Sequence, residues 1–173
     1  MGDLAEAEST MRTAIDREPY LTAAYVNLAD IYRQTGREME AEVLLRSAIE
    51  NNPQNPTGYF ALGLSLVRSG QLREAVITLG DAATLAPNEP YYQYVAGIAL
   101  NSNGEREAGL TTLHEVHNQF PGHRDTLFAL ATIYRDEENW DTAELYTRRL
   151  LSISPSDGPA QALLKEIEGI AIR

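Results

Sequence analysis

The sequence lacks cysteine, has few basic residues and contains no long apolar run, and each absence excludes a class of protein. Without cysteine the chain has no disulfide, thiolate zinc site, covalent c-type haem or thiol nucleophile, although its compartment stays open. Its 14 Lys and Arg residues face 25 Asp and Glu residues, and the net charge of −11 argues against a nucleic-acid partner, which needs clustered positive charge. The longest apolar stretch, about residues 59–67, is too short for membrane insertion, and the first ten residues show no signal peptide.

What the sequence does contain is a regular internal repeat, with a period of about 34 residues, which indicates stacked units. Five of the eight prolines follow it at identical intervals, at Pro19, Pro53, Pro87, Pro121 and Pro155. Glycine follows it at Gly2, Gly36, Gly70 and Gly104, and Glu138 breaks this column. Small residues follow it in two further columns, one at Ala29, Gly63, Gly97 and Ala131, the other at Ala7, Ala41, Ala75, Gly109 and Ala143. We expect these two small columns to face each other where paired helices approach closely.

Each period predicts two helices. In the first full period Tyr25, Leu28 and Tyr32 recur at helical spacing, and Gly36 then provides a positive-φ stop. A second apolar stripe follows until Pro53 ends it. No segment alternates strictly between apolar and polar residues, so no strand is expected. The predicted helices lie near 3–17, 22–35, 38–51, 56–69, 72–85, 90–103, 106–119, 124–137, 140–153 and 158–171.

These columns resemble those of the tetratricopeptide repeat (TPR) family, whose unit is a helix–turn–helix with the same period. The resemblance covers essentially the whole chain and implies an all-α fold, a right-handed superhelix of antiparallel helix pairs with about ten helices. It predicts one array over 1–173, divided into a half repeat at 1–21, full repeats at 22–55, 56–89, 90–123 and 124–157, and a C-terminal capping helix at 158–173. Gln93, Glu138 and Thr147 depart from the family's large or glycine residues, so the third and fourth units are expected to be less regular.

The two ends of the array differ. The segment 1–21 supplies only the second helix of a unit, and its apolar stripe of Leu4, Ala7, Met11 and Ala14 lacks a first helix to pack on. We therefore expect this chain to be the C-terminal segment of a larger bacterial repeat protein. We also expect it to form a weak homodimer through this exposed helix. A complete small protein with a frayed first helix is the alternative. At the other end, Lys165 and Glu168 stand in columns that are apolar or small elsewhere, as befits a capping helix.

The resemblance implies a function in protein–protein interaction, with a peptide or helix bound in the concave groove that the first helices line. Projected onto that groove, the sequence supplies fourteen residues: Val26, Asp30, Arg33, Phe60, Leu64, Val67, Arg68, Tyr91, Tyr94, Ile98, Asn101, Phe128, Thr132 and Arg135.

One column of this groove is apolar in every full unit, at Val26, Phe60, Tyr94 and Phe128. An exposed stripe of this kind predicts an apolar or amphipathic ligand, with polar contacts at its edges from Arg33, Arg68, Asn101 and Arg135. The alternative is that the stripe packs against neighbouring first helices and only narrows the groove. A family subclass that grips a C-terminal carboxylate with Lys and Asn is not matched, since Val26, Asp30 and Tyr91 occupy the corresponding places.

Three other candidate sites are weak. The glycines of residues 58–65 have phosphate-loop spacing, but Leu64 stands where the lysine must be. His114, His117 and His123, with Glu115, form a cluster whose i, i+3 spacing differs from the i, i+4 of metalloproteases, and a solvated helix face is the preferred interpretation. The acidic turn of Asp136, Glu137, Glu138 and Asp141 lacks the ligand spacing of a calcium loop, so it is interpreted as surface charge.

No serine can be assigned to a base, so neither an enzyme nor a cofactor or metal is expected. The predicted function is a non-catalytic scaffold for an unidentified protein or peptide. The alternative is a docking or regulatory C-terminal region of a larger bacterial enzyme or multi-haem cytochrome-like protein, to which residues 91–164 bear a faint likeness.

Overall fold

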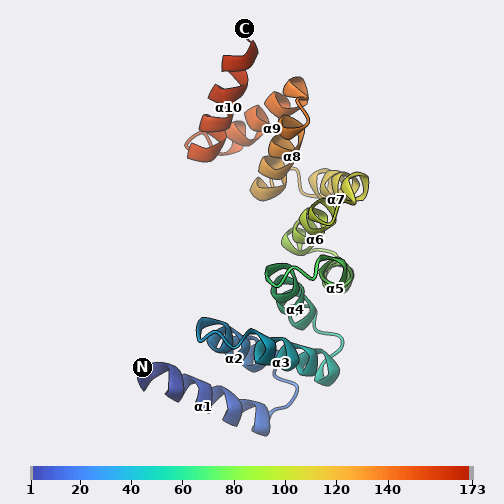
Figure 1. Ribbon diagram of the computed structural model, residues 1–173. Coiled ribbons are helices and arrows are strands. Elements are labelled where there is room, and N and C mark those ends of the chain that lie inside the picture. Colours follow the sequence, from blue (N-terminus) through green and yellow to red (C-terminus); the bar gives the residue numbers. More distant parts are fainter. Residues whose placement is uncertain (1, 172–173) are drawn as a thin grey trace.

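The computed structural model describes residues 2–171, which form ten α-helices and, within that range, no strand (Figure 1). The helices are α1 (Gly2–Arg17), α2 (Thr22–Gln34), α3 (Glu38–Asn51), α4 (Pro56–Arg68), α5 (Leu72–Leu85), α6 (Pro90–Ser102), α7 (Arg106–Gln119), α8 (Arg124–Asp136), α9 (Trp140–Ile153) and α10 (Gly158–Ala171). Each begins and ends within one residue of its predicted bounds, so the all-α array is confirmed. None of the described helices is long and apolar enough to cross a membrane.

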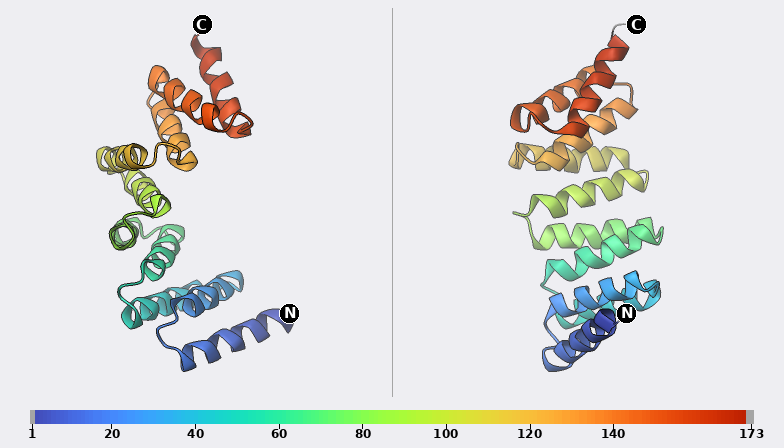
Figure 2. Two further views of the ribbon diagram at one scale, coloured as in Figure 1. Left: turned by 180° about the vertical axis from the view of Figure 1, so that it is seen from behind. Right: turned by 90° about the vertical axis from the view of Figure 1, so that its left-hand side faces the viewer.

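The helices stack in antiparallel pairs as a curved superhelical solenoid (Figures 1 and 2). Figure 1 shows α4 and α6 on the hollow side of the curve, and α5 and α7 on its outer side. The two ends of the chain lie at opposite ends of the array, and each helix packs only against helices of its own or the next unit. The molecule therefore has no central core, and its hollow side is a continuous surface built from successive first helices.

The turn inside each helix pair depends on one residue with left-handed backbone. Glycine provides it in three pairs, with φ of 75°, 77° and 88° at Gly36, Gly70 and Gly104. In the fourth pair Glu138 adopts the same conformation, with φ of 59°. The next amide, that of Asn139, donates to the carbonyl oxygen of Tyr134 at 2.9 Å, as the equivalent amides do in the glycine turns. The backbone geometry is thus kept without glycine, at a steric cost of about 1 kcal/mol.

The turns between pairs are held by side chains. Asn55 caps α4 by accepting a hydrogen bond from the amide of Thr57 at 3.0 Å, and Pro56 occupies the first turn, where no amide is needed. Gln93, which stands where the family has a large residue, donates from Nε2 to the carbonyl oxygen of Pro87 at 2.6 Å. The departure at Gln93 therefore leaves the turn intact, because this hydrogen bond stabilises it.

The small columns do mark the closest helix approaches. A Cβ added to Gly109 would lie 2.8 Å from the carbonyl oxygen of Gly97, so in α6 and α7 the two columns meet directly. A Cβ on Gly63 would lie 2.5 Å from Cγ of Leu79, so in α4 the glycine faces a large residue instead of its small partner. Thr147, the other departure, is fully buried and donates to the carbonyl oxygen of Ala143 at 2.7 Å.

The expectation of a bare stripe on the first helix is wrong for most of its length. The helix α1 packs on α2, where Met11 and Ile15 contact the core of the first units, and Ala14 is half-buried. Only Leu4 of the stripe is an exposed large side chain, so the predicted weak homodimer would depend chiefly on it. At the other end, Lys165 and Glu168 are exposed, in keeping with their polar character.

Candidate functional site

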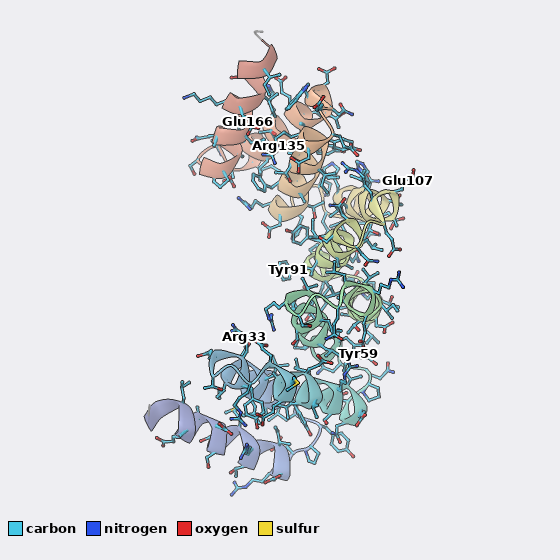
Figure 3. All side chains as sticks on the ribbon, viewed as in Figure 1. Arg33, Tyr59, Tyr91, Glu107, Arg135 and Glu166 are labelled. Carbon is cyan, nitrogen blue, oxygen red and sulfur yellow. The ribbon has the colours of Figure 1, made fainter. Side chains whose placement is uncertain are left out.

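The predicted groove residues lie on the four helices α2, α4, α6 and α8. Figure 3 shows Arg33 and Tyr91 on the hollow side of the curve and Glu107 on the outer side. Four of the fourteen are exposed, namely Asp30, Val67, Arg68 and Tyr91. The other ten are half-buried, namely Val26, Arg33, Phe60, Leu64, Tyr94, Ile98, Asn101, Phe128, Thr132 and Arg135. The projection therefore brings these residues to one side of the molecule, where most are in contact with their neighbours.

The apolar column is less exposed than the sequence suggested. Val26, Phe60, Tyr94 and Phe128 each pack against the core of their own or the next unit. The guanidinium of Arg124 also lies over the Phe128 ring, 5.2 Å from its centroid. Much of each of these side chains is therefore in contact with the core, and only the remainder is open to the groove.

An aromatic cluster crosses the middle of the groove. The Phe60 ring of α4 lies 4.6 Å from the Tyr92 centroid and 5.6 Å from that of Tyr91, both on α6. Tyr94 continues the chain of rings, 6.0 Å from Tyr91 and 5.8 Å from the ring of His123 at the start of α8. Burial raises the pKa of Tyr94. With 47% of its surface exposed, Tyr91 is the ring most open to a ligand.

Two of these rings, Tyr92 and His123, were not among the predicted site residues. The sequence does contain an indication, because three tyrosines follow Pro90 in the first turns of one helix, at Tyr91, Tyr92 and Tyr94. The repeat assigns Tyr91 and Tyr94 to the groove but not Tyr92. Tyr92 and His123 join the cluster through the spacing between helices, which the sequence does not state.

A small pocket lies between α2 and α4, on the groove side. Its cavity measures about 200 Å³ and its lining is Val26, Asp30, Thr57, Phe60, Ala61, Leu64 and Arg68. Within residues 2–171, no ion pair or side-chain hydrogen bond engages Arg68. Asp30 pairs with Arg33 on its own helix at 3.3 Å. The pocket therefore combines an apolar interior with one uncommitted cation.

At the α8 end of the groove, the polar side chains already have partners within the protein. Arg135 pairs with Asp136 at 2.7 Å and lies 3.6 Å from Glu166 of α10, beside which Figure 3 shows it. Thr132 donates its hydroxyl proton to the carbonyl oxygens of its own helix, at 2.9 and 3.0 Å. Of the three arginines expected to contact a ligand, Arg68 is therefore the most available.

The histidines form neither a metal site nor a solvated face. His114 Nε2 lies 2.8 Å from the Tyr134 hydroxyl, and its Nδ1 lies 3.2 Å from the Tyr146 hydroxyl. His117 is buried against the Tyr146 ring, and among the described residues its Nδ1 finds no hydrogen-bond partner. Burial lowers the pKa of both side chains. Among the described residues there is no group of three His, Asp or Glu side chains that could hold a metal.

The interpretation of these histidines as part of a solvated helix face was thus wrong. The repeat position of His117 does predict that this side chain is buried. His117 occupies a column whose other members are Ile15, Ile49, Ala83 and Leu151, all apolar. A residue in that column faces the neighbouring helix whatever its polarity.

The remaining candidates are structural. Residues 58–65 lie inside the helix α4, where Gly63 packs against Leu79, so they form no phosphate loop. In the acidic turn, Glu137 pairs with Arg106 and Asp136 with Arg135, which fits the interpretation as surface charge.

Comparison with known proteins agrees with the architecture. Two family models, both described as tetratricopeptide repeat, match residues 1–57 and 126–160, together more than half of the chain. No curated protein matches the sequence.

Three solved structures illustrate the likeness in fold. YrrB, a TPR protein with an unusual peptide-binding site, is 23% identical with a TM-score of 0.74, over 95% of this chain and 84% of that one. A tetratricopeptide repeat protein from Parabacteroides merdae is 20% identical with a TM-score of 0.79, over 96% and 66%. The thermophilic TPR protein TTC0263 of Thermus thermophilus is 20% identical with a TM-score of 0.72, over 96% and 91%. The chain therefore belongs to the tetratricopeptide repeat family, and its fold is that of a protein–protein interaction scaffold.

Proposed function

We propose that this protein is a non-catalytic scaffold that binds a peptide or helical segment along the groove of α2, α4, α6 and α8. The observation that carries the proposal is the pocket between α2 and α4, which opens beside the aromatic cluster and contains the uncommitted Arg68. The proposal treats the chain as one array with full units at 22–55, 56–89, 90–123 and 124–157.

The chemistry of the groove favours an apolar or amphipathic ligand. Val26, Phe60 and Leu64 offer a pocket for one apolar side chain, and the exposed face of Tyr91 offers a platform for the next. Aromatic rings contribute strongly to binding because they bury a large area with little loss of side-chain entropy. YrrB, whose fold is similar, has a peptide-binding site of its own, which supports this proposal without specifying its residues.

A purely binding role is supported by what the polar residues do. The side chains that come closest to a reactive cluster, His114, Tyr134 and Tyr146, hydrogen-bond to one another where α7, α8 and α9 meet, away from the pocket. The pocket contains one carboxylate, Asp30, and one hydroxyl side chain, Thr57, and among the described residues Asp30 pairs with Arg33 and makes no hydrogen bond to Thr57.

The experiment should use side chains that bind without also supporting the fold. Phe60→Ala with Tyr94→Ala removes rings that pack against the core, so a loss of binding could reflect loosened packing. Tyr91→Ser and Arg68→Ser remove exposed groups instead. Tyr20→Ser is the matched control, since Tyr20 is also exposed and lies outside the groove.

A random peptide library displayed on phage would be panned on the wild-type protein, and enriched peptides measured by fluorescence anisotropy. We expect each groove variant to weaken these peptides about tenfold, the usual effect of losing a central contact, and the control to bind as the wild type does. If the peptides bind both groove variants with wild-type affinity, the groove is not the binding site.

A further inference from the structure

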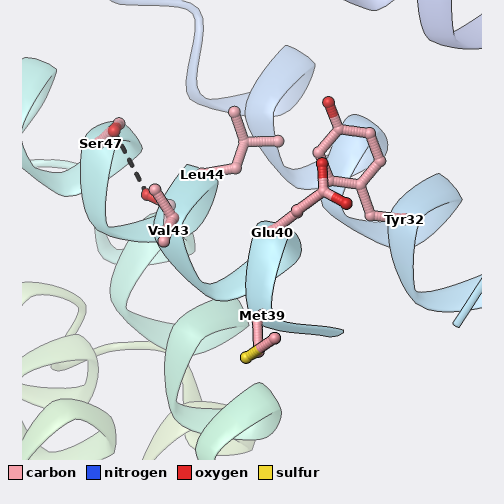
Figure 4. A pocket seen from close by; sticks show the side chains of 6 residues that line it. All are labelled: Tyr32, Met39, Glu40, Val43, Leu44 and Ser47. Carbon is pink, nitrogen blue, oxygen red and sulfur yellow. Dashed lines mark hydrogen bonds between the residues drawn. The ribbon is translucent and has the colours of Figure 1, made fainter. Parts of the chain in front are cut away.

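We propose a second interaction surface on α3, which binds a basic amphipathic helix. The surface, called here the α3 patch, consists of Met39, Val43 and Leu44 with the pocket beside them, whose cavity measures about 390 Å³ (Figure 4). Tyr32, Glu40 and Ser47 complete the lining. The patch shares no residue with the groove pocket, so the proposal stands independently of the function proposed above.

The exposure of the α3 patch is greater than the fold requires. Met39 is 85% exposed and Val43 66% exposed, and they lie one helical turn apart. The same two repeat positions carry Arg73 and Ile77 in α5, Glu107 and Thr111 in α7, and Asp141 and Leu145 in α9. Since the other second helices place a charged residue at the first position, an apolar side chain there is not needed for packing. Two adjacent exposed apolar residues occur together only in α3 among these four helices.

The pocket beside the patch is preformed. The ring of Tyr32 forms part of its lining, and the guanidinium of Arg37 lies over this ring, 3.9 Å from the centroid. Arg12 holds the Tyr32 hydroxyl by a 3.0 Å hydrogen bond. On the opposite wall, the Ser47 hydroxyl donates to the carbonyl oxygen of Val43 at 3.2 Å, as Figure 4 shows. The polar groups of the lining are therefore largely engaged, and the space between them suits an apolar side chain.

The charge around the patch selects the partner. Glu38 and Glu42 follow one side of the Met39–Val43 row, where Arg68 of α4 is the one cation lining the same hollow, and Glu40 lies on the other side. Glu40 and Glu42 pair with Arg37 and Arg46, whereas no ion pair within residues 2–171 engages Glu38. Residues 1–55 carry ten acidic and five basic side chains, so the surroundings are also acidic.

An apolar row with an acidic border complements a helix that has aliphatic anchors at i, i+3 and i+4 and Lys or Arg beside them. An acidic helix would be repelled, and an extended basic peptide without anchors would leave the pocket empty. The two features together therefore specify a basic amphipathic helix.

The probe is a synthetic helical peptide of about 18 residues with leucine at i, i+3, i+4 and i+7 and lysine at the flanking positions, the spacing of one helix face. A second peptide replaces every lysine by glutamate, and a third has the composition of the first with its apolar face scrambled. Binding is measured by anisotropy with the wild-type protein, with Met39→Ser/Val43→Ser, and with Ile77→Ser/Leu145→Ser. The last variant is the matched control, because Ile77 and Leu145 are 66% and 62% exposed at the repeat position of Val43.

We expect the lysine peptide to bind the wild type and the control variant alike, and to bind Met39→Ser/Val43→Ser about tenfold more weakly. The glutamate and scrambled peptides should bind the wild type at least tenfold more weakly than the lysine peptide. In protein labelled with ¹³C-methyl methionine, the Met39 signal should shift on titration.

Several outcomes would overturn the proposal. One is equal weakening by the control variant, and another is equal binding of the scrambled peptide, which would indicate charge attraction alone. Loss of binding in Tyr91→Ser/Arg68→Ser, with Met39→Ser/Val43→Ser unaffected, would move the peptide to the groove. A dimer in sedimentation that Met39→Ser/Val43→Ser dissociates would assign the patch to a second copy of this chain.

Discussion

The outer junction between α3 and α5 and the one between α7 and α9 use the same repeat position for different contacts. At the first, Arg46 joins Glu42 of its own helix to Glu74 of α5, at 2.8 and 2.7 Å. At the second, the equivalent residue is His114, whose nitrogens face the hydroxyls of Tyr134 and Tyr146. The repeat thus determines where a bridging side chain stands, and the identity of that side chain determines how the junction responds to salt and pH.

The largest expected effect on the free energy of unfolding comes from glycines that lie between paired helices, Gly109 between α7 and α6 and Gly63 between α4 and α5. Gly109→Ala would push a methyl group against the backbone of α6, which cannot move without separating the helices. Gly63→Ala in α4 would meet the side chain of Leu79, which can change its rotamer. We expect Gly109→Ala to lower the free energy of unfolding by about 2 kcal/mol and Gly63→Ala by about 1 kcal/mol or less. Urea denaturation of both variants measures the difference, and equal losses would contradict it.

The next effect concerns the buried His117 of the α7–α9 region. Its Nδ1 is buried without a partner, in a column that is otherwise apolar. Replacing it by leucine removes the unsatisfied group and keeps the volume nearly constant, so His117→Leu should raise the free energy of unfolding by about 1 kcal/mol. A lower melting temperature for this variant would show that the imidazole has a favourable contact at that position.

The two junctions should lose their contributions to stability at different pH values. Burial lowers the pKa of His114 and His117, so the folded state favours neutral rings. Their contribution to stability is therefore full above the unfolded pKa of about 6.5 and is lost as pH falls through the lowered folded pKa. The hydrogen bond from Arg46 lowers the pKa of Glu74, so the other junction keeps its contribution until pH falls below about 4.5.

We therefore expect wild-type stability to fall already between about pH 6.5 and 5, where carboxylates stay charged. His114→Asn/His117→Leu should flatten this part of the curve, and Glu74→Gln should not. Chemical denaturation at a series of pH values tests both, and an unchanged slope in the double histidine variant would refute the assignment.

A smaller effect distinguishes the turns of the two regions. Glu138 adopts a left-handed conformation that glycine supplies in the equivalent turns. Glu138→Gly should therefore raise the free energy of unfolding by about 0.5 kcal/mol or less, the steric gain of about 1 kcal/mol less the entropy that glycine loses on folding. The reverse change, Gly104→Glu, should lower it, and thermal melts of the pair test the symmetry.

The smallest effect is expected at the ion-paired junction. Arg46 and Glu74 are both partly exposed, so solvent screens their attraction. Arg46→Gln should cost about 0.5 kcal/mol or less, and the cost should decrease further in high salt. A salt-independent loss would mean that the stem of Arg46, rather than its charge, stabilises the junction.

The sequence predicted helix bounds closely because each bound depends on a local requirement. Gly36, Gly70 and Gly104 permit the left-handed turn, and Asn55 with Pro56 starts a helix. Such features need no knowledge of distant residues, which is why they can be found by comparing one period of the sequence with the next.

The candidate site was predictable only in part. The side of the array on which Arg33 and Tyr91 lie follows from the repeat and is seen in the structure (Figure 3). The burial of Phe60 and Tyr94 does not follow from it, because that depends on how near the next helix lies. The contact of Tyr92 with Phe60 also depends on the distance between helices. The inward orientation of His114 does too, because its hydrogen-bond partners lie 20 and 32 residues away in the sequence.

By itself, the sequence determined the number of helices, their ends, the position of the small columns and the acidic character of the chain, since these depend on residue type and period. The tertiary structure alone decided which apolar side chains stay exposed and which cations lack a partner. Met39 became a candidate binding residue, and Arg68 was singled out among the predicted groove residues, only when the neighbouring helices were in place. The physical reason is that burial and pairing depend on the distance between elements, which a periodic pattern of residue types does not specify.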